Sequence, residues 1–125
     1  MLKEQINFKV LLRSPKYPVI VISDDGLFPA YDIKQLGTLC VISESLDDDY
    51  ELKVVDSTGS EFKFFPEQTT LIPGFLNKRW TKKQIIEIYN ESVKAEETGI
   101  KYPLKSLSNK KLSLIIGEIC DLLMS

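Results

Sequence analysis

The sequence predicts an α+β protein: a five- or six-stranded antiparallel meander, or a small SH3-like barrel, followed by two C-terminal amphipathic helices. Two observations predict this fold class. Residues 1–73 contain short apolar segments separated by turn residues about every ten positions, which is typical of antiparallel strands. Residues 74–125 contain apolar residues spaced three and four apart, which is typical of helices. Because 125 residues is a common length for one domain, we expect residues 1–125 to form a single domain.

The first strands are marked by two different apolar patterns. Apolar residues alternate with largely polar ones from Ile6 to Leu12, which predicts a strand with one polar face. The segment Val19–Ile22 is apolar throughout, which predicts a central strand covered on both faces. Asp24–Gly26 then provides a strong turn signal.

The middle of the β-rich half is predicted as a hairpin. Residues 27–37 are compatible with a loop or with one helical turn that Gly37 ends. Thr38–Ser45 and Tyr50–Val55 are predicted as two strands, and residues 46–49 as the four-residue loop between them.

Two further strands complete the predicted sheet. Asp56–Ser60 reads as a turn, and Glu61–Phe65 reads as a strand that Pro66 ends. Thr69–Ile72 is predicted as a last short strand.

The first helix has a clear start and stop. Thr81 is a good N-cap, and Gln84 three residues later completes a capping box. Trp80 and Ile85 occupy the positions of a hydrophobic staple, and Gly99 is a natural helix end. One stripe of the helix is expected to be buried: Ile85, Ile88, Tyr89, Ser92 and Val93.

The last helix follows the same logic. Ser108 is the predicted N-cap, and Gly117 is expected to allow close packing against a neighbouring element. The expected apolar face consists of Leu112, Ile115, Ile116, Ile119, Leu122 and Leu123.

The composition removes several classes of chemistry. The chain contains no histidine, which excludes Ser-His-Asp and Cys-His catalysis and histidine-ligated zinc. Cys40 and Cys120 lie in apolar stretches, so we expect two buried thiols. The glycines occur singly, so no phosphate-binding loop is present, and the adjacent aspartates lack the spacing of an EF-hand. We therefore expect no catalytic residue, no cofactor and no bound metal.

A basic cluster stands at the start of the first predicted helix. Lys78, Arg79, Lys82 and Lys83 surround Trp80. An aromatic residue among cations is typical of single-strand nucleic-acid binding, and a helix start favours anions. A solvated helix start explains the same residues, and a net charge of −2 is not typical of nucleic-acid binding. Binding of nucleic acid or phosphate is therefore the alternative interpretation.

Acidic residues gather instead in the turns of the β-rich half. Residues 1–73 hold seven Lys and Arg against twelve Asp and Glu, whereas residues 74–125 hold nine against six. If the acidic turns meet at one end of the sheet, they favour a basic protein partner through electrostatic steering; ordinary solubility explains the same charges. The candidate partner-binding residues are Asp24, Asp25, Asp47, Asp48, Asp49 and Glu51.

The acidic half, the run Asp47–Asp49, the missing histidine and the sheet-plus-helices pattern resemble bacterial immunity proteins of polymorphic and contact-dependent toxin systems. The resemblance implies a small cytoplasmic protein without catalytic residues. It also implies stoichiometric binding of a basic partner such as a toxin domain. No continuous apolar run is longer than the four residues of Val19–Ile22, and the N-terminal residues lack the apolar core of a secretion signal. We therefore expect a cytoplasmic location and no membrane contact.

Overall fold

The computed structural model describes residues 8–24, 26–44, 52–74, 78–107 and 109–125. In this part of the chain the strands are β1 (Lys9–Val10), β2 (Val19–Ser23), β3 (Gly26–Ala30), β4 (Lys53–Val55), β5 (Glu61–Phe65) and β6 (Thr70–Pro73). The α-helices are α1 (Ile33–Glu44), α2 (Lys82–Asn90), α3 (Val93–Thr98) and α4 (Leu112–Met124). Two short 3-10 helices are η1 (Pro66–Gln68) and η3 (Leu104–Leu107). None of the helices in the described ranges is long and apolar enough to span a membrane.

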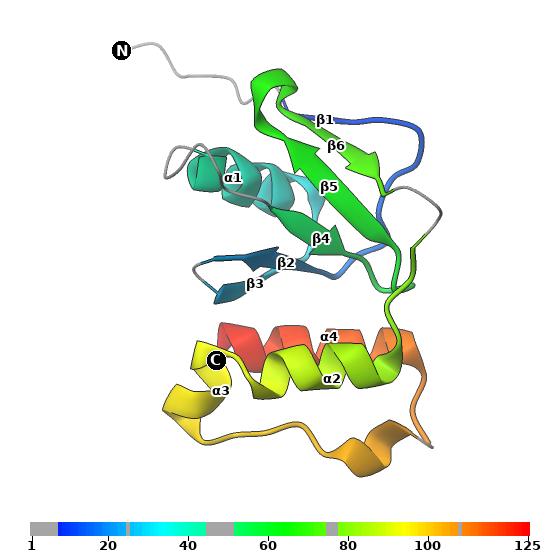
Figure 1. Cartoon of the computed structure of the whole chain (residues 1–125), viewed down its shortest axis with the longest axis vertical. Helices are drawn as coiled ribbons and strands as arrows, with labels where there is room; N and C mark the ends of the chain where they lie inside the picture. Colours follow the sequence, from blue (N-terminus) through cyan, green and yellow to red (C-terminus); the bar gives the residue numbers. More distant parts are fainter. Residues whose placement is uncertain (1–7, 25, 45–51, 75–77, 108) are drawn as a thin grey trace.

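The molecule has three layers, with the sheet between α1 on one face and α2, α3 and α4 on the other (Figure 1). The fold class is therefore α+β, as predicted. The strand order is β1, β6, β5, β4, β2, β3, and β1 and β3 are the two edges of the sheet. Since the edge strands do not pair with each other, the sheet is open, and the predicted barrel is wrong.

The sheet is mixed rather than purely antiparallel. β1 pairs in parallel with β6, and all other neighbouring strands pair antiparallel. β3 and β4 flank β2 and both run antiparallel to it, so they are parallel to each other. Parallel strands cannot be joined by a tight turn and need a long crossover, usually a helix. Here α1 is that crossover, and the predicted meander is wrong at this point.

The segment Thr38–Ser45, predicted as a strand, lies in α1 as far as Glu44. The helix starts earlier because Asp32 Oδ1 accepts a hydrogen bond from the Gln35 N–H at 2.8 Å, as an N-cap does. Gly37 lies inside the helix instead of ending it, and a Cβ there would lie 3.1 Å from the Phe8 ring. The short apolar run fits a helix and a strand equally well, so its length and periodicity did not distinguish them.

The first predicted helix is divided in two. The capping box of Thr81 and Gln84 is confirmed. The helix then ends at Asn90, and Ser92 caps α3 by accepting a hydrogen bond from the Ala95 N–H at 3.2 Å. Ser92 is therefore a cap and not part of the buried stripe, and the side chain of Val93 is 60% exposed.

Helix α4 confirms its predicted apolar face but not its predicted start. Lys111 stands at the N-cap without a side-chain cap, and Ser108 lies outside the described residues. Apart from the backbone of its own helix, no described residue has an atom within 4 Å of where a Cβ of Gly117 would be, so the expected close packing is wrong. The buried residues are Ile115, Ile116, Ile119, Cys120 and Leu123, with Leu112 and Leu122 partly buried against the same core.

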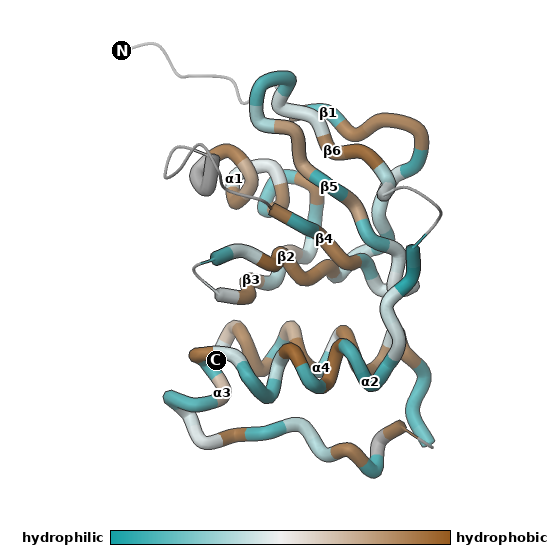
Figure 2. The backbone as a smooth tube through the Cα atoms, in the orientation of Figure 1, coloured by the Kyte–Doolittle hydropathy of each residue, from teal (hydrophilic) through white to brown (hydrophobic). Residues whose placement is uncertain are grey.

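Two apolar clusters hold the layers together. Val19 and Val21 of β2 face α1, whereas Ile20 faces the layer of α2 to α4, which confirms the strand predicted to be covered on both faces. Figure 2 shows this apolar character along β2 and in α4. Ile20 and Val55 of the sheet pack in one cluster with Ile115 of α4, so residues before and after Pro73 share a core.

Candidate protein-binding surface

The acidic residues singled out in the sequence belong to two segments whose flanks meet. Asp24 lies in the turn between β2 and β3 and is exposed. Ile22 of β2 pairs with Leu27 of β3 on one side and with Lys53 of β4 on the other. The pairing places the β2–β3 turn and the start of β4 at the same end of the sheet, which we call the acidic end. The other candidates lie outside the described residues: Asp25, Asp47, Asp48, Asp49 and Glu51.

The chain enters β4 from a helix and not from the strand of the predicted hairpin. Residues 46–49 lie outside the described residues, and the element before them is α1 rather than a strand. The segment 45–51 therefore joins the C-terminal end of α1 to β4. The meeting of Ile22, Leu27 and Lys53, which flank the two acidic segments, depends on this helical crossover, which the sequence analysis did not predict.

The basic cluster near the start of α2 contacts other parts of the protein. Lys78 Nζ lies 3.6 Å from Glu61 Oε1, and Arg79 Nη1 donates to the Thr58 carbonyl at 3.4 Å. Lys82 Nζ donates to the Leu107 carbonyl at 3.3 Å. Lys83 forms an exposed pair with Glu87 at 4.0 Å, the kind of contact that contributes little. Each of the four cations thus has a partner within the chain.

Trp80 connects this basic segment to the sheet. Its Nε1–H donates to Glu61 Oε1 at 2.8 Å, and its backbone N–H donates to the Gly59 carbonyl at 2.8 Å. Gly59 has a φ of +86°, and a Cβ there would lie 2.8 Å from the Trp80 carbonyl oxygen. The close approach of the two segments therefore requires glycine at position 59. Trp80 is partly buried against the same cluster as Ile85, in keeping with the predicted staple.

The turn Asp56–Ser60 is held by one buried carboxylate. Asp56 Oδ1 accepts hydrogen bonds from the Thr58 N–H, the Thr58 hydroxyl and the Ser60 N–H at 2.6–3.1 Å. Its Oδ2 accepts from the Lys16 N–H at 3.0 Å. These bonds to fixed donors give Asp56 a structural role in the turn.

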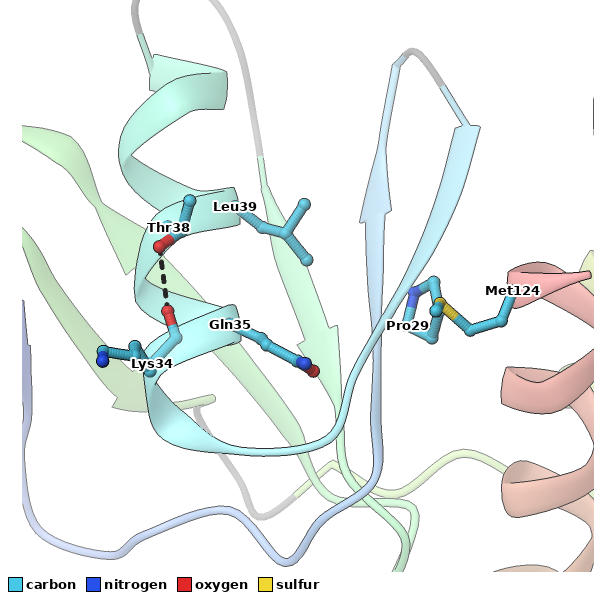
Figure 3. A pocket seen from close by; sticks show the side chains of 6 residues that line it. All are labelled: Pro29, Lys34, Gln35, Thr38, Leu39 and Met124. Atoms are coloured by element: carbon cyan, nitrogen blue, oxygen red, sulfur yellow. Dashed lines mark hydrogen bonds between the residues drawn. The ribbon is translucent and has the colours of Figure 1, made fainter.

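The edge strand β3 borders a groove that the sequence analysis did not predict (Figure 3). The groove has a volume of about 380 Å³ and lies between α1, β3 and the end of α4. It is lined by Pro29, Lys34, Gln35, Thr38, Leu39 and Met124. Four of these residues belong to α1. The sequence analysis placed Thr38 and Leu39 in a strand and left residues 27–37, with Lys34 and Gln35, open between a loop and one helical turn, so it did not predict the groove. The sequence does contain a signal for the start of α1. Asp32 followed three residues later by Gln35 is a helix-start pattern, and it precedes an apolar run.

A second groove, of about 430 Å³, lies beside α4. Its wall contains a hydrogen-bonded cluster in which Glu118 Oε1 accepts from the Tyr102 hydroxyl at 2.5 Å and from Lys110 Nζ at 2.8 Å. These hydrogen bonds, that of Lys110 first, lower the pKa of Glu118 below its ordinary value. Through these hydrogen bonds, Tyr102 and Lys110 hold the segment between α3 and α4 against Glu118 of α4.

The two thiols are buried, and burial lowers their reactivity. Cys40 and Cys120 are buried and free, as predicted, and burial raises the pKa of each thiol to about 12. A thiol with such a pKa is a poor nucleophile at neutral pH. In the described ranges, no three Cys, Asp or Glu side chains come together in a way that could hold a metal ion.

Comparison with protein-family models, with curated proteins and with solved structures finds no match to this chain.

Proposed function

We propose that this chain is a non-catalytic protein-binding module, and most concretely an immunity protein that neutralises a toxin by stoichiometric binding through its acidic end. The observation that carries the proposal is the register of β2. Because Ile22 pairs with both Leu27 and Lys53, the flanks of both acidic segments lie together. Charges of one sign concentrated at one end of a molecule steer an oppositely charged protein into encounter.

The alternative, nucleic-acid or phosphate binding by Lys78, Arg79, Lys82 and Lys83, has weaker support. Each of these cations contacts an acceptor within the chain. An incoming phosphate would have to compete with these contacts. Oligonucleotide binding that falls steeply with salt, and that Lys82→Ala with Lys83→Ala weakens, would revive this reading.

The proposal is tested by co-expressing the chain with the C-terminal domain of the protein encoded next to it. We expect that domain to arrest growth alone, and to be neutralised in a one-to-one complex measured by light scattering. If co-expression does not relieve the arrest, the immunity function is wrong.

The acidic end is tested in the purified complex. Reversal of Asp47, Asp48 and Asp49 to Lys is expected to lower the association rate about tenfold at low salt, with a smaller effect on dissociation. A matched reversal of Glu91, Glu96 and Glu97, which are exposed on or beside α3, changes the net charge equally and serves as the control. Equal effects of the two triple variants would show that net charge, and not the acidic end, governs association.

A further inference from the structure

The outer edge of β3 is open to another strand. β3 pairs with β2 on one side, and no strand of the described chain pairs with its other side. The groove shown in Figure 3 lies along this edge. Open strand edges bind extended peptides through backbone hydrogen bonds, with side-chain pockets adding specificity.

The backbone of β3 shows which groups face outward. Proline has no N–H and fits a strand only where its nitrogen faces away from a partner strand, so Pro29 points its backbone groups to the open edge. The Tyr31 N–H points the same way, because it donates to Gln35 Oε1 at 2.7 Å instead of to β2. Backbone groups alternate in direction along a strand, so Leu27 also faces outward. The groups left for a partner are the Leu27 N–H, the Leu27 carbonyl and the Pro29 carbonyl.

Helices from both sides of the sheet lie beside β3. Phe28 pairs with Val21, whose side chain is in the α1 cluster, so Phe28 faces α1. Pro29 pairs with Ile20 and faces the other layer, where Met124 of α4 lies beside it (Figure 3). The groove therefore has walls from α1 and from α4. An added strand would place alternate side chains against these two walls.

Pro29 also indicates what kind of strand fits. Suppose the β3 strands of two copies paired antiparallel with Phe28 opposite Phe28. Leu27 of each copy would then lie opposite Pro29 of the other. Each such pair would form one of its two backbone hydrogen bonds, because proline has no N–H to donate. A foreign strand with ordinary N–H groups loses only the bond that Pro29 itself cannot donate. The edge thus disfavours a second copy of this chain.

We propose that the β3 edge and its groove bind an extended segment of the partner protein, added antiparallel to β3, with cationic residues at the C-terminal end of that segment. The charge preference rests on the proposed function. An antiparallel strand runs from Ala30 toward Gly26, so its C-terminal end arrives beside the exposed Asp24. Backbone pairing and charge attraction would then act on one continuous segment.

The test uses a random octapeptide library displayed on phage and selected against the purified full chain. We expect enriched peptides to alternate apolar and polar residues and to carry Lys or Arg near the C-terminus. Synthetic copies are then titrated by fluorescence anisotropy. Absence of enrichment would overturn the proposal.

Two groove variants localise the binding. Thr38→Trp fills the groove from α1, and Met124→Glu places a charge in it from the exposed end of α4. Both are expected to weaken peptide binding about tenfold or more. Leu114→Trp, on an exposed position of α4 outside the groove, is the matched control and should bind as the parent does. Parent-like binding by both groove variants would contradict the proposal.

Backbone N-methylation separates strand pairing from charge. Methylating successive peptide nitrogens should weaken binding at alternate positions only, because only every second N–H faces β3. If N-methylation has no alternating effect while Asp24→Lys weakens binding, the strand proposal fails and the acidic end stands. If the alternation is present while Asp24→Lys changes nothing, strand addition stands and the acidic steering of the proposed function fails.

Discussion

The hydroxyl of Tyr17 is buried and makes no hydrogen bond with any residue that the structure describes. Burial, and to a lesser extent the charge of Asp32, raise the pKa of this tyrosine to about 12. A buried polar group without a partner lowers stability because it gives up its hydrogen bonds to water. The contrast is Tyr102, whose hydroxyl donates to Glu118.

Tyr17→Phe is therefore expected to raise the free energy of unfolding by about 1 kcal/mol, measured by urea denaturation. Tyr102→Phe removes a hydroxyl that does form a hydrogen bond, and it should lower the free energy of unfolding by about 1 kcal/mol. Equal losses in both variants would mean that the Tyr17 hydroxyl has a partner in solution.

Individual residues also show why local chemistry was only partly predictable. The role of Thr81 follows from its neighbours in sequence, so the capping box could be predicted. The carboxylate of Glu61 is held by Trp80 and Lys78, far along the chain, and nothing near residue 61 indicates that contact. The four basic residues likewise acquired their partners from distant segments.

At the scale of elements, α4 contains a glycine that nothing in its surroundings requires. Outside the backbone of α4 itself, the described residues place no atom within 4 Å of a Cβ at position 117, and the residue is in the helix interior. Gly117→Ala is expected to raise the free energy of unfolding by about 1 kcal/mol, because alanine loses less backbone entropy in a helix. Gly59→Ala is the contrasting variant and should destabilise the protein, since φ is +86° and the Trp80 carbonyl blocks the Cβ. Loss of stability in Gly117→Ala would point to an element packed there that the structure does not show.

The segment joining α3 to α4 depends on an ionised carboxylate. This carboxylate belongs to Glu118. The hydrogen bonds that it accepts from Lys110 and Tyr102 hold its pKa below the ordinary value of 4.5. The ionised form is thus favoured by folding, so its contribution is present above about pH 4.5 and is lost as the pH falls through the lowered pKa.

Glu118→Gln should make the melting temperature less sensitive to acid between about pH 6 and pH 3, measured by circular dichroism. Glu97→Gln, exposed on α3, removes the same charge and is the control. An unchanged acid dependence in Glu118→Gln would show that this hydrogen-bonded cluster does not contribute to stability.

The elements that could be predicted are those with a complete local signal. The strand Glu61–Phe65 ends at a proline as expected, and β6 begins one residue after the predicted start. The strand predicted over Thr38–Ser45 is wrong because its apolar run Leu39–Ile42 is short enough to suit a strand as well as a helix. In the structure Leu36 and Cys40 are buried one helical turn apart in α1. The break between α2 and α3 was missed because Ser92 fits a helical stripe and a cap equally well.

On the scale of the whole molecule, the two halves of the chain share an apolar core. The helices after Pro73 cover the sheet face that carries Ile20 and Val55. A fragment of residues 1–74 would expose that face to water. We expect the fragment to lack a cooperative thermal transition and to bind a hydrophobic dye, whereas the full chain unfolds cooperatively. A cooperative transition in the fragment would show that the sheet and α1 are stable without the helical layer.

Local sequence patterns are enough to predict the fold class, the capped start of α2 at Thr81, the apolar face of α4, the doubly covered strand β2 and the two buried thiols. Each of these follows from caps, turns or periodicity within a few residues. Tertiary packing fixes the strand order, the parallel β1, the crossover through α1, the meeting of Ile22, Leu27 and Lys53 and the groove beside β3. These features join residues far apart in the chain, and the choice among pairings depends on how all layers pack together, which no local pattern encodes.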